Sequence, residues 1–148
     1  MITVKRTNSN DSDFKNLISM LDEELRILDG HDAPFYAELN KTHDIDAVVA
    51  YMDGQPVGSG AIRPLNDSME IKRMFTLKEH RGKGIASAVL SELETWCSEL
   101  GYKTCVLETG KKQPRAISLY KRVGFVEIPN YGQYIGVENS VCFKKTLS

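Results

Sequence analysis

Apolar residues recur along the chain with two periods, and the switches between them divide it into strands and helices. Alternation of apolar and polar residues predicts a first strand over Ile2–Arg6. The apolar residues that follow are three or four positions apart, which predicts a helix capped by Asp11 or Ser12 and ending near Gly30. Its apolar stripe consists of Phe14, Leu17, Ile18, Leu21, Leu25 and Leu28. We expect this stripe to face a core.

A run of strands follows in the middle of the chain. Ala47–Met52 and Pro56–Arg63 read as strands, and Asp53-Gly54 between them is typical of a type I′ hairpin turn. Asn66-Asp67 then turns the chain into a third strand, Glu70–Leu77. These features predict a meander of antiparallel strands.

A long amphipathic helix separates this meander from the next strand. Its apolar positions run from Ile85 to Leu100 with helical spacing, and Gly101 is a typical helix stop. The apolar strand that follows is Thr104–Glu108. Because the helix makes the crossover, we expect this strand to lie parallel to Glu70–Leu77.

The last part of the chain adds one helix and two strands. Pro114 suits a first helical turn, and Gly124 ends that helix. Phe125–Ile128 and Val141–Thr146 read as the closing strands. The whole pattern predicts a mixed α/β fold in which helices cover a central, mostly antiparallel sheet.

Composition is that of an ordinary soluble domain. The chain has 148 residues, 41% of them hydrophobic, and a net charge of −1. This length supports one domain over residues 1–148 with a single sizeable core. We see no apolar run long enough to span a membrane and no signal-peptide profile, so a cytoplasmic protein is expected. Neither the charge nor any aromatic-basic motif favours nucleic acid.

Cysteine and histidine give little reason to expect a metal. Cys97, Cys105 and Cys142 are widely spaced and form no CxxC motif, so we expect buried thiols rather than ligands. His31-Asp32 and His43-Asp44 are interpreted as solvated loop residues. No bound metal is predicted.

The loop before the long helix has the features of an anion site. Arg81-Gly82-Lys83-Gly84-Ile85-Ala86 joins a strand to a helix whose first N–H groups lack partners and attract phosphate. A Walker A loop is excluded because Lys83 is followed by Gly84. A dinucleotide fingerprint fits less well, because its third small position falls on Ser87 and Lys78–Arg81 separate the strand from the first glycine.

Three segments together resemble the GNAT superfamily of N-acetyltransferases. Arg81, Gly84 and Ala86 match that superfamily's Gln/Arg-x-x-Gly-x-Gly/Ala pyrophosphate loop. Ala116 to Phe125 is similar to its Ala-x-x-Leu-Tyr-x-x-x-Gly-Phe segment, and Glu70 lies where some members carry a catalytic glutamate. The resemblance covers roughly Gln55 to Phe125. It implies the GNAT fold and an acetyl-CoA-dependent N-acetyltransferase acting on a primary amine, which we expect to belong to a small molecule.

The resemblance also implies the residues that hold acetyl-CoA. Main-chain groups of Met74, Phe75 and Thr76 are expected along the pantetheine arm and at the thioester oxygen. The pyrophosphate is expected on the loop residues Arg81, Gly82, Lys83, Gly84, Ile85 and Ala86. Further contacts are expected from Gln113, Ala116 and Tyr120, where Gln113 replaces the superfamily's usual asparagine. The adenosine 3′-phosphate has five candidate cations: Lys111, Lys112, Arg115, Lys121 and Arg122.

Acetyl transfer needs a base for the amine and an acid for the thiolate. The candidate base is Glu70, and Glu108 at the end of the neighbouring strand is the reserve. A purely structural role for Glu70, as partner of Lys72 or Arg73, is the alternative. Tyr120 is the candidate general acid, and its alternative is a core tyrosine.

The acceptor site is less well specified. Phe35 and Tyr36, Glu108, and Tyr131 and Tyr134 are the candidate substrate contacts. Residues 1–70 carry a charge of −7 and residues 71–148 a charge of +6, which suits a cationic acceptor beside an anionic cofactor. Two other functions remain open: a non-catalytic acyl-CoA sensor on the same fold and a nicotinamide dinucleotide-binding protein. A homodimer is expected by analogy alone.

Overall fold

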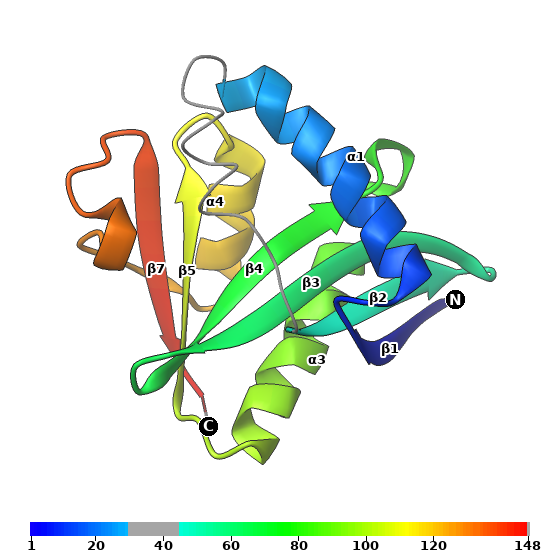
Figure 1. Cartoon of the computed structure of the whole chain (residues 1–148), viewed down its shortest axis with the longest axis horizontal. Coiled ribbons are helices and arrows are strands. Elements are labelled where there is room, and N and C mark those ends of the chain that lie inside the picture. Colours follow the sequence, from blue (N-terminus) through cyan, green and yellow to red (C-terminus); the bar gives the residue numbers. More distant parts are fainter. Residues whose placement is uncertain (30–44, 148) are drawn as a thin grey trace.

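One seven-stranded sheet runs through the protein (Figure 1). The computed structural model describes residues 1–29 and 45–147, so Phe35, Tyr36, His31 and His43 lie outside the described residues. The strand order is β1-β2-β3-β4-β5-β7-β6. The strands are β1 (Ile2–Asn8), β2 (Asp46–Met52), β3 (Gln55–Leu65), β4 (Ser68–Thr76), β5 (Thr104–Gly110), β6 (Val126–Ile128) and β7 (Ser140–Thr146). The helices are α1 (Ser12–Asp29), α3 (Ile85–Glu99) and α4 (Pro114–Arg122), with short 3₁₀ turns η2 (Lys78–His80) and η3 (Gly132–Tyr134).

The predicted fold class is confirmed, and so is the central hairpin. Strands β2 and β3 pair antiparallel up to Met52 and Gln55, which leaves Asp53 and Gly54 as a two-residue turn. Both turn residues have positive φ, 52° and 83°, as a type I′ turn requires. The local turn chemistry therefore sets the register of this hairpin.

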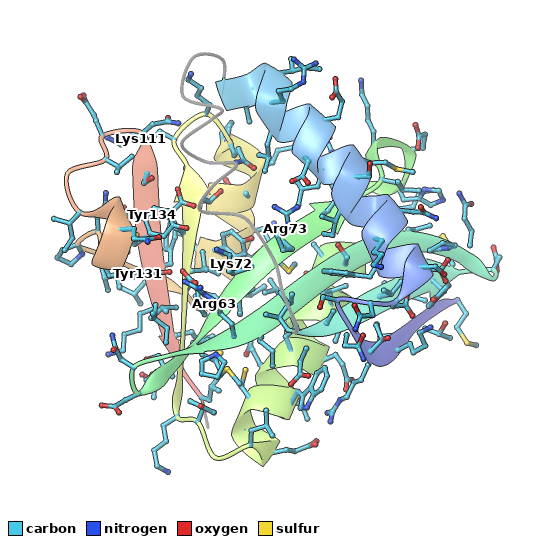
Figure 2. All side chains as sticks on the ribbon, viewed as in Figure 1. Arg63, Lys72, Arg73, Lys111, Tyr131 and Tyr134 are labelled. Carbon is cyan, nitrogen blue, oxygen red and sulfur yellow. The ribbon has the colours of Figure 1, made fainter. Side chains whose placement is uncertain are left out.

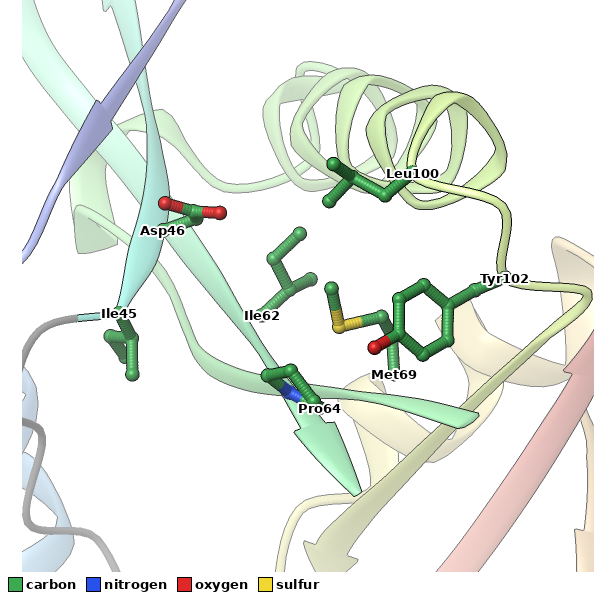
Figure 3. A pocket seen from close by; sticks show the side chains of 7 residues that line it. All are labelled: Ile45, Asp46, Ile62, Pro64, Met69, Leu100 and Tyr102. Carbon is green, nitrogen blue, oxygen red and sulfur yellow. The ribbon is translucent and has the colours of Figure 1, made fainter. Parts of the chain in front are cut away.

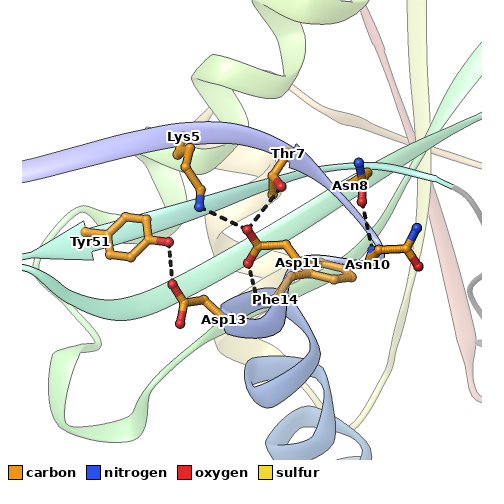
Figure 4. A network of polar contacts seen from close by, with 8 residues as sticks. All are labelled: Lys5, Thr7, Asn8, Asn10, Asp11, Asp13, Phe14 and Tyr51. Carbon is orange, nitrogen blue, oxygen red and sulfur yellow. Dashed lines mark hydrogen bonds and ion pairs between the residues drawn. The ribbon is translucent and has the colours of Figure 1, made fainter.

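Asp11 joins β1 to the start of α1 (Figure 4). Its Oδ1 accepts the Phe14 N–H at 3.0 Å, and its Oδ2 accepts from Lys5 Nζ at 2.9 Å and Thr7 Oγ1 at 3.1 Å. Burial opposes ionisation here, but these donors hold the pKa of Asp11 below its ordinary value. Of the two predicted caps, Asp11 and Ser12, it is therefore Asp11 that caps the helix, and it also links the helix to the first strand.

Each face of the sheet has its own helical cover (Figure 1). On one face α1 packs Phe14, Leu17 and Leu21 against strand residues such as Val49 and Ala61. On the other face α3 and α4 cover a second cluster that includes Val89, Leu93 and Tyr120. The predicted stripe of α1 is therefore core, and the two faces offer different chemistry at the centre of the sheet.

Strands β4 and β5 are parallel, as the crossover predicts, but they pair over only a short length. The register runs from Met69 opposite Cys105 to Ile71 opposite Leu107 and stops there. Both strands continue, to Thr76 and Gly110, without further pairing to one another. The sheet therefore opens between the second halves of β4 and β5, a feature that the sequence pattern did not predict.

A β-bulge in β4 lies at this opening. Ser59 opposes Phe75 and Ala61 opposes Lys72, so Arg73 and Met74 together face the single residue Gly60. Arg73 has a φ of 59°, unusual for a residue with a side chain. The bulge changes which side chains of β4 point to which face.

Candidate active site

A cleft of about 110 Å³ occupies the opening between β4 and β5. Side chains from both faces of the sheet reach this cleft, because β4 and β5 have separated there and no longer form a barrier between the two faces. Its wall comprises Leu21 and Leu25 of α1, Ile71, Lys72, Arg73 and Met74 of β4, Glu108, Thr109 and Gly110 of β5, and Gln113, Ala116 and Tyr120 at α4. Five of the predicted site residues thus share one cleft: Met74, Glu108, Gln113, Ala116 and Tyr120.

The start of α3 has the properties of an anion site. Gly82 and Gly84 have φ values of 79° and 84°, which favour glycine, and Gly84 provides no side-chain cap for the helix. The first main-chain bond of the helix runs from the Ala88 N–H to the Gly84 carbonyl. The amides of Ile85 and Ala86 precede that bond, so they remain directed out of the first turn, where a phosphate binds well.

The side chain of Arg81 contacts protein groups. Its Nε donates to the Thr76 carbonyl at 3.1 Å, and its Nη2 donates to both carboxylate oxygens of Glu24 at 2.9 and 2.8 Å. Arg81 therefore links the loop to the end of β4 and to α1. Phe75 is buried, Thr76 is half-buried and Lys83 is exposed, which leaves Lys83 accessible to an anion at the loop.

Tyr120 is buried in the cleft wall, with 5% of its surface exposed. Its ring packs edge-on against Phe125 at 5.8 Å between centroids and at a tilt against Phe143 at 6.1 Å. Burial, and then the charge of Glu108, raises the pKa of the phenol above its ordinary value. Tyr120 is therefore held protonated at neutral pH, as a proton donor must be.

Glu108 is the carboxylate that lines the cleft together with Tyr120. It lies near the end of β5 and accepts a hydrogen bond from Ser140 Oγ of β7 at 2.7 Å. The Ser140 contact orients the carboxylate, and the half-buried position keeps it within reach of the cleft.

Glu70 lies deeper and earlier on β4, outside the cleft wall, with 1% of its surface exposed. Its Oε1 accepts from Arg63 Nε at 2.7 Å, and its Oε2 accepts from the Tyr131 hydroxyl at 2.7 Å. Lys72 Nζ lies 4.0 Å away. The partner role that the sequence offered as the alternative thus involves Arg63 and Lys72, and the catalytic role of Glu70 stays a prediction.

Tyr131 and Tyr134 cover this charged group from the connection between β6 and β7. Their rings meet edge-to-face at 5.7 Å, and burial raises the pKa of both phenols. In Figure 2 Tyr131 and Tyr134 lie at one side, and Arg63, Lys72 and Arg73 continue from them across β4 towards α1, while Lys111 lies apart from this group. Burial also lowers the pKa of Lys72, although the charge of Glu70 opposes that shift.

Seven members of the cleft wall were not predicted as site residues: Leu21, Leu25, Ile71, Lys72, Arg73, Thr109 and Gly110. Four of them add chemistry or shape to the cleft. Leu21 and Leu25 were assigned to the core stripe of α1, and Lys72 and Arg73 were considered only as partners of Glu70. The signal for the last two was Gly60, because a glycine opposite consecutive charged strand residues indicates a bulge. The five candidate 3′-phosphate cations are all exposed on α4 and the loop before it, and their role stays a prediction.

A second hollow, of about 360 Å³, lies at the other end of β4 beside the end of α3 (Figure 3). Its wall consists of Ile45, Asp46, Ile62, Pro64, Met69, Leu100 and Tyr102. It contains one carboxylate and none of the predicted site residues. The smaller cleft therefore holds the candidate chemistry, despite its lower volume.

Two other properties of the described residues bear on the site. Within residues 1–29 and 45–147, no three His, Cys, Asp or Glu side chains are grouped as a metal ion would need. Among the helices of the same part of the chain, none has both the length and the apolar character needed to cross a membrane.

Comparison with solved structures agrees with this architecture. A crystal structure of a Klebsiella pneumoniae protein described as an acyl-CoA N-acyltransferase has a TM-score of 0.84 and 29% identity, over 100% of this chain and 99% of that one. The PaiA N-acetyltransferase of Thermoplasma acidophilum, solved with coenzyme A, has a TM-score of 0.75 over 99% of both chains. At 16% identity the second likeness shows the fold alone.

Sequence comparison points to the same group. The uncharacterized N-acetyltransferase YjgM of Escherichia coli is 39% identical over 85 residues, which are 55% of this chain and 50% of YjgM. An IAA acetyltransferase of Azospirillum brasilense is 36% identical over 93 residues, 62% of this chain and 61% of that protein. The chain thus spans about half the length of the first of these relatives. The acetyltransferase (GNAT) family matches residues 14–125, and because this match covers most of the chain, the protein belongs to that family.

Proposed function

We propose that this protein transfers the acetyl group of acetyl-CoA to the primary amine of a small molecule. The main support for this proposal is that Tyr120 and Glu108 line the same cleft. This cleft lies between β4 and β5, which separate just before the anion-binding loop. GNAT membership supports acetyl-CoA as the donor. The cleft and the uncapped start of α3 suit the two ends of this molecule, its thioester arm and its pyrophosphate.

The residues of the chain have distinct roles in this proposal. Amides of Ile85 and Ala86, with Lys83, hold the pyrophosphate, and the unpaired edge of β4 at Met74 holds the pantetheine arm. Acetyl-CoA supplies a thioester carbonyl, to which the amine forms a new C–N bond as the C–S bond breaks. Amides aimed at the charge that develops on that oxygen are worth on the order of 3 kcal/mol.

Protons move at two side chains. An alkylamine has a pKa near ~10.4 and cannot attack while protonated, so a base within reach adds about 10²- to 10⁴-fold. Glu108 is the better supported base, because it lines the cleft together with Tyr120, whereas Glu70 is 1% exposed and lies outside the cleft wall. The Tyr120 phenol, protonated at neutral pH, donates to the departing thiolate.

Release of free thiol from acetyl-CoA tests the proposal, with amino acids, polyamines, aminoglycosides and peptides as acceptors. Tyr120→Phe should lower kcat by about 10²-fold or more while the KM for acetyl-CoA changes little. Equal changes in both constants would contradict the acid role. Binding of CoA without turnover of any amine would favour the acyl-CoA sensor.

A further inference from the structure

The bulge in β4 places two consecutive cations on the same face of the sheet. Lys72 opposes Ala61, which packs against α1, so Lys72 faces α1. Met74 faces α3, because its sulfur lies with Val89 and Leu93 near Gly60. Arg73, between them, turns back to α1 and donates from Nη2 to Asp22 Oδ1 at 2.5 Å. A regular strand would have sent Lys72 and Arg73 to opposite faces.

The Arg73 guanidinium has unused donors. Its side chain is 2% exposed, and the Asp22 side chain that it contacts is 58% exposed. Nε and Nη1 of Arg73 are buried and have no hydrogen-bond partner among the described residues. Water screens the charge of Asp22 more than that of the buried guanidinium, so the cation is only partly compensated. A buried charged group with open donors is unfavourable unless a ligand accepts from them.

Arg73 lines the candidate cleft together with Tyr120 and Glu108. The cofactor's phosphates have their own site at the start of α3, and its thioester arm carries no charge. An anionic ligand that reaches Arg73 from this cleft would therefore belong to the other substrate. A guanidinium fork matches a carboxylate best, through paired N–H donors.

We propose that Arg73 binds a carboxylate of the acceptor, so that the substrates are amines that also carry a carboxylate, such as amino acids. This inference rests on the proposed acetyl transfer. The cleft then recognises both groups of the acceptor: Glu108 receives the proton of the amine, and Arg73 fixes the carboxylate. Leu21 and Leu25 in the same wall suit an acceptor that also has an apolar part, between or beside its amine and its carboxylate.

Matched pairs of acceptors test the proposal through kcat/KM for thiol release. The pairs are phenylalanine and 2-phenylethylamine, leucine and isoamylamine, and 4-aminobutyrate and butylamine. The wild-type protein should prefer at least one carboxylate-bearing partner on the order of 100-fold. Arg73→Met should abolish that preference while the Kd for CoA, measured without acceptor, stays unchanged. Arg26→Met removes an exposed cation of α1 that pairs with Glu23 in the same helix and does not line the cleft, so it should behave as wild type.

The outcomes separate the two proposals. Equal use of both members of every pair, or a preference that survives in Arg73→Met, would overturn the role of Arg73. Loss of CoA binding in Arg73→Met would assign Arg73 to the cofactor instead and overturn it too. If no amine is turned over, the proposed acetyl transfer is wrong, and carboxylate binding can still be tested by itself. In that test N-acetylphenylalanine, added together with CoA, should raise the Tm of the wild-type protein but not the Tm of Arg73→Met. If Arg73→Met does not fold, Arg73→Lys, which keeps the charge without the fork, should show a reduced preference.

Discussion

Replacing Glu70 by glutamine distinguishes a structural from a catalytic carboxylate. The amide keeps the size of the side chain but removes the charge that faces Arg63 and Lys72. The Arg63 side chain is 42% exposed, so water screens it, and the loss of that pair should cost below about 1 kcal/mol. Lys72 is different, because its side chain is 5% exposed.

Removing one partner of a buried ion pair costs about 3–5 kcal/mol. The Lys72 pair is at the long limit of 4.0 Å, and Glu108 also acts on Lys72, so we expect a total near the lower figure, about 3 kcal/mol. In a chain of this length each 1 kcal/mol lowers the Tm by roughly 2–4 °C, so the Tm should fall by about 6–12 °C.

Thermal unfolding and thiol release, measured on the same preparations, provide the assay. The matched control is Glu108→Gln, whose half-buried carboxylate accepts a hydrogen bond from Ser140. This variant should lose about 1 kcal/mol of stability but about 10²- to 10⁴-fold in kcat. The reasoning is refuted if Glu70→Gln has the Tm of wild type and a kcat lowered by a factor of that size. The base would then be Glu70.

Three further predictions concern pH, packing and the cofactor loop. Folding raises the pKa values of Tyr131 and Tyr134, so their contribution to stability is complete below pH ~10, the pKa of an unfolded tyrosine, and is lost as the pH rises above it. The free energy of unfolding, measured with urea, should therefore be lower at pH 10.5 than at pH 8. Equal values at the two pH values would contradict this prediction. Gly60→Ala should lower stability by about 1–3 kcal/mol, since the new Cβ would lie 2.7–2.8 Å from atoms of Met74, Leu93 and Val89; an unchanged Tm would show that α3 can shift. Glu24→Gln should tighten CoA binding about threefold at low salt, because it frees Arg81 and removes a negative charge beside the anion site. Weaker binding in calorimetry would mean that the Glu24–Arg81 ion pair preorganises the loop.

The sequence by itself determined the elements whose causes are local. Asp53-Gly54 needs no distant partner to form a type I′ turn, and Asp11 caps the helix that follows it directly. Gly84 likewise leaves the first amides of α3 open whatever packs nearby. Periodicity and capping act over a few residues, so the order of strands and helices and the anion loop could be predicted.

Only the tertiary structure decided how these elements combine. Insertion of β7 between β5 and β6, and the early end of the β4–β5 pairing, depend on contacts between residues far apart in the chain. The same contacts bring Tyr131 to Glu70 and Asp22 to Arg73. No local pattern specifies such pairs, because burial and charge are set by whichever segments meet. The carboxylate predicted as the base is therefore engaged by protein donors, and the cleft carries an arginine that the pattern alone did not assign to it.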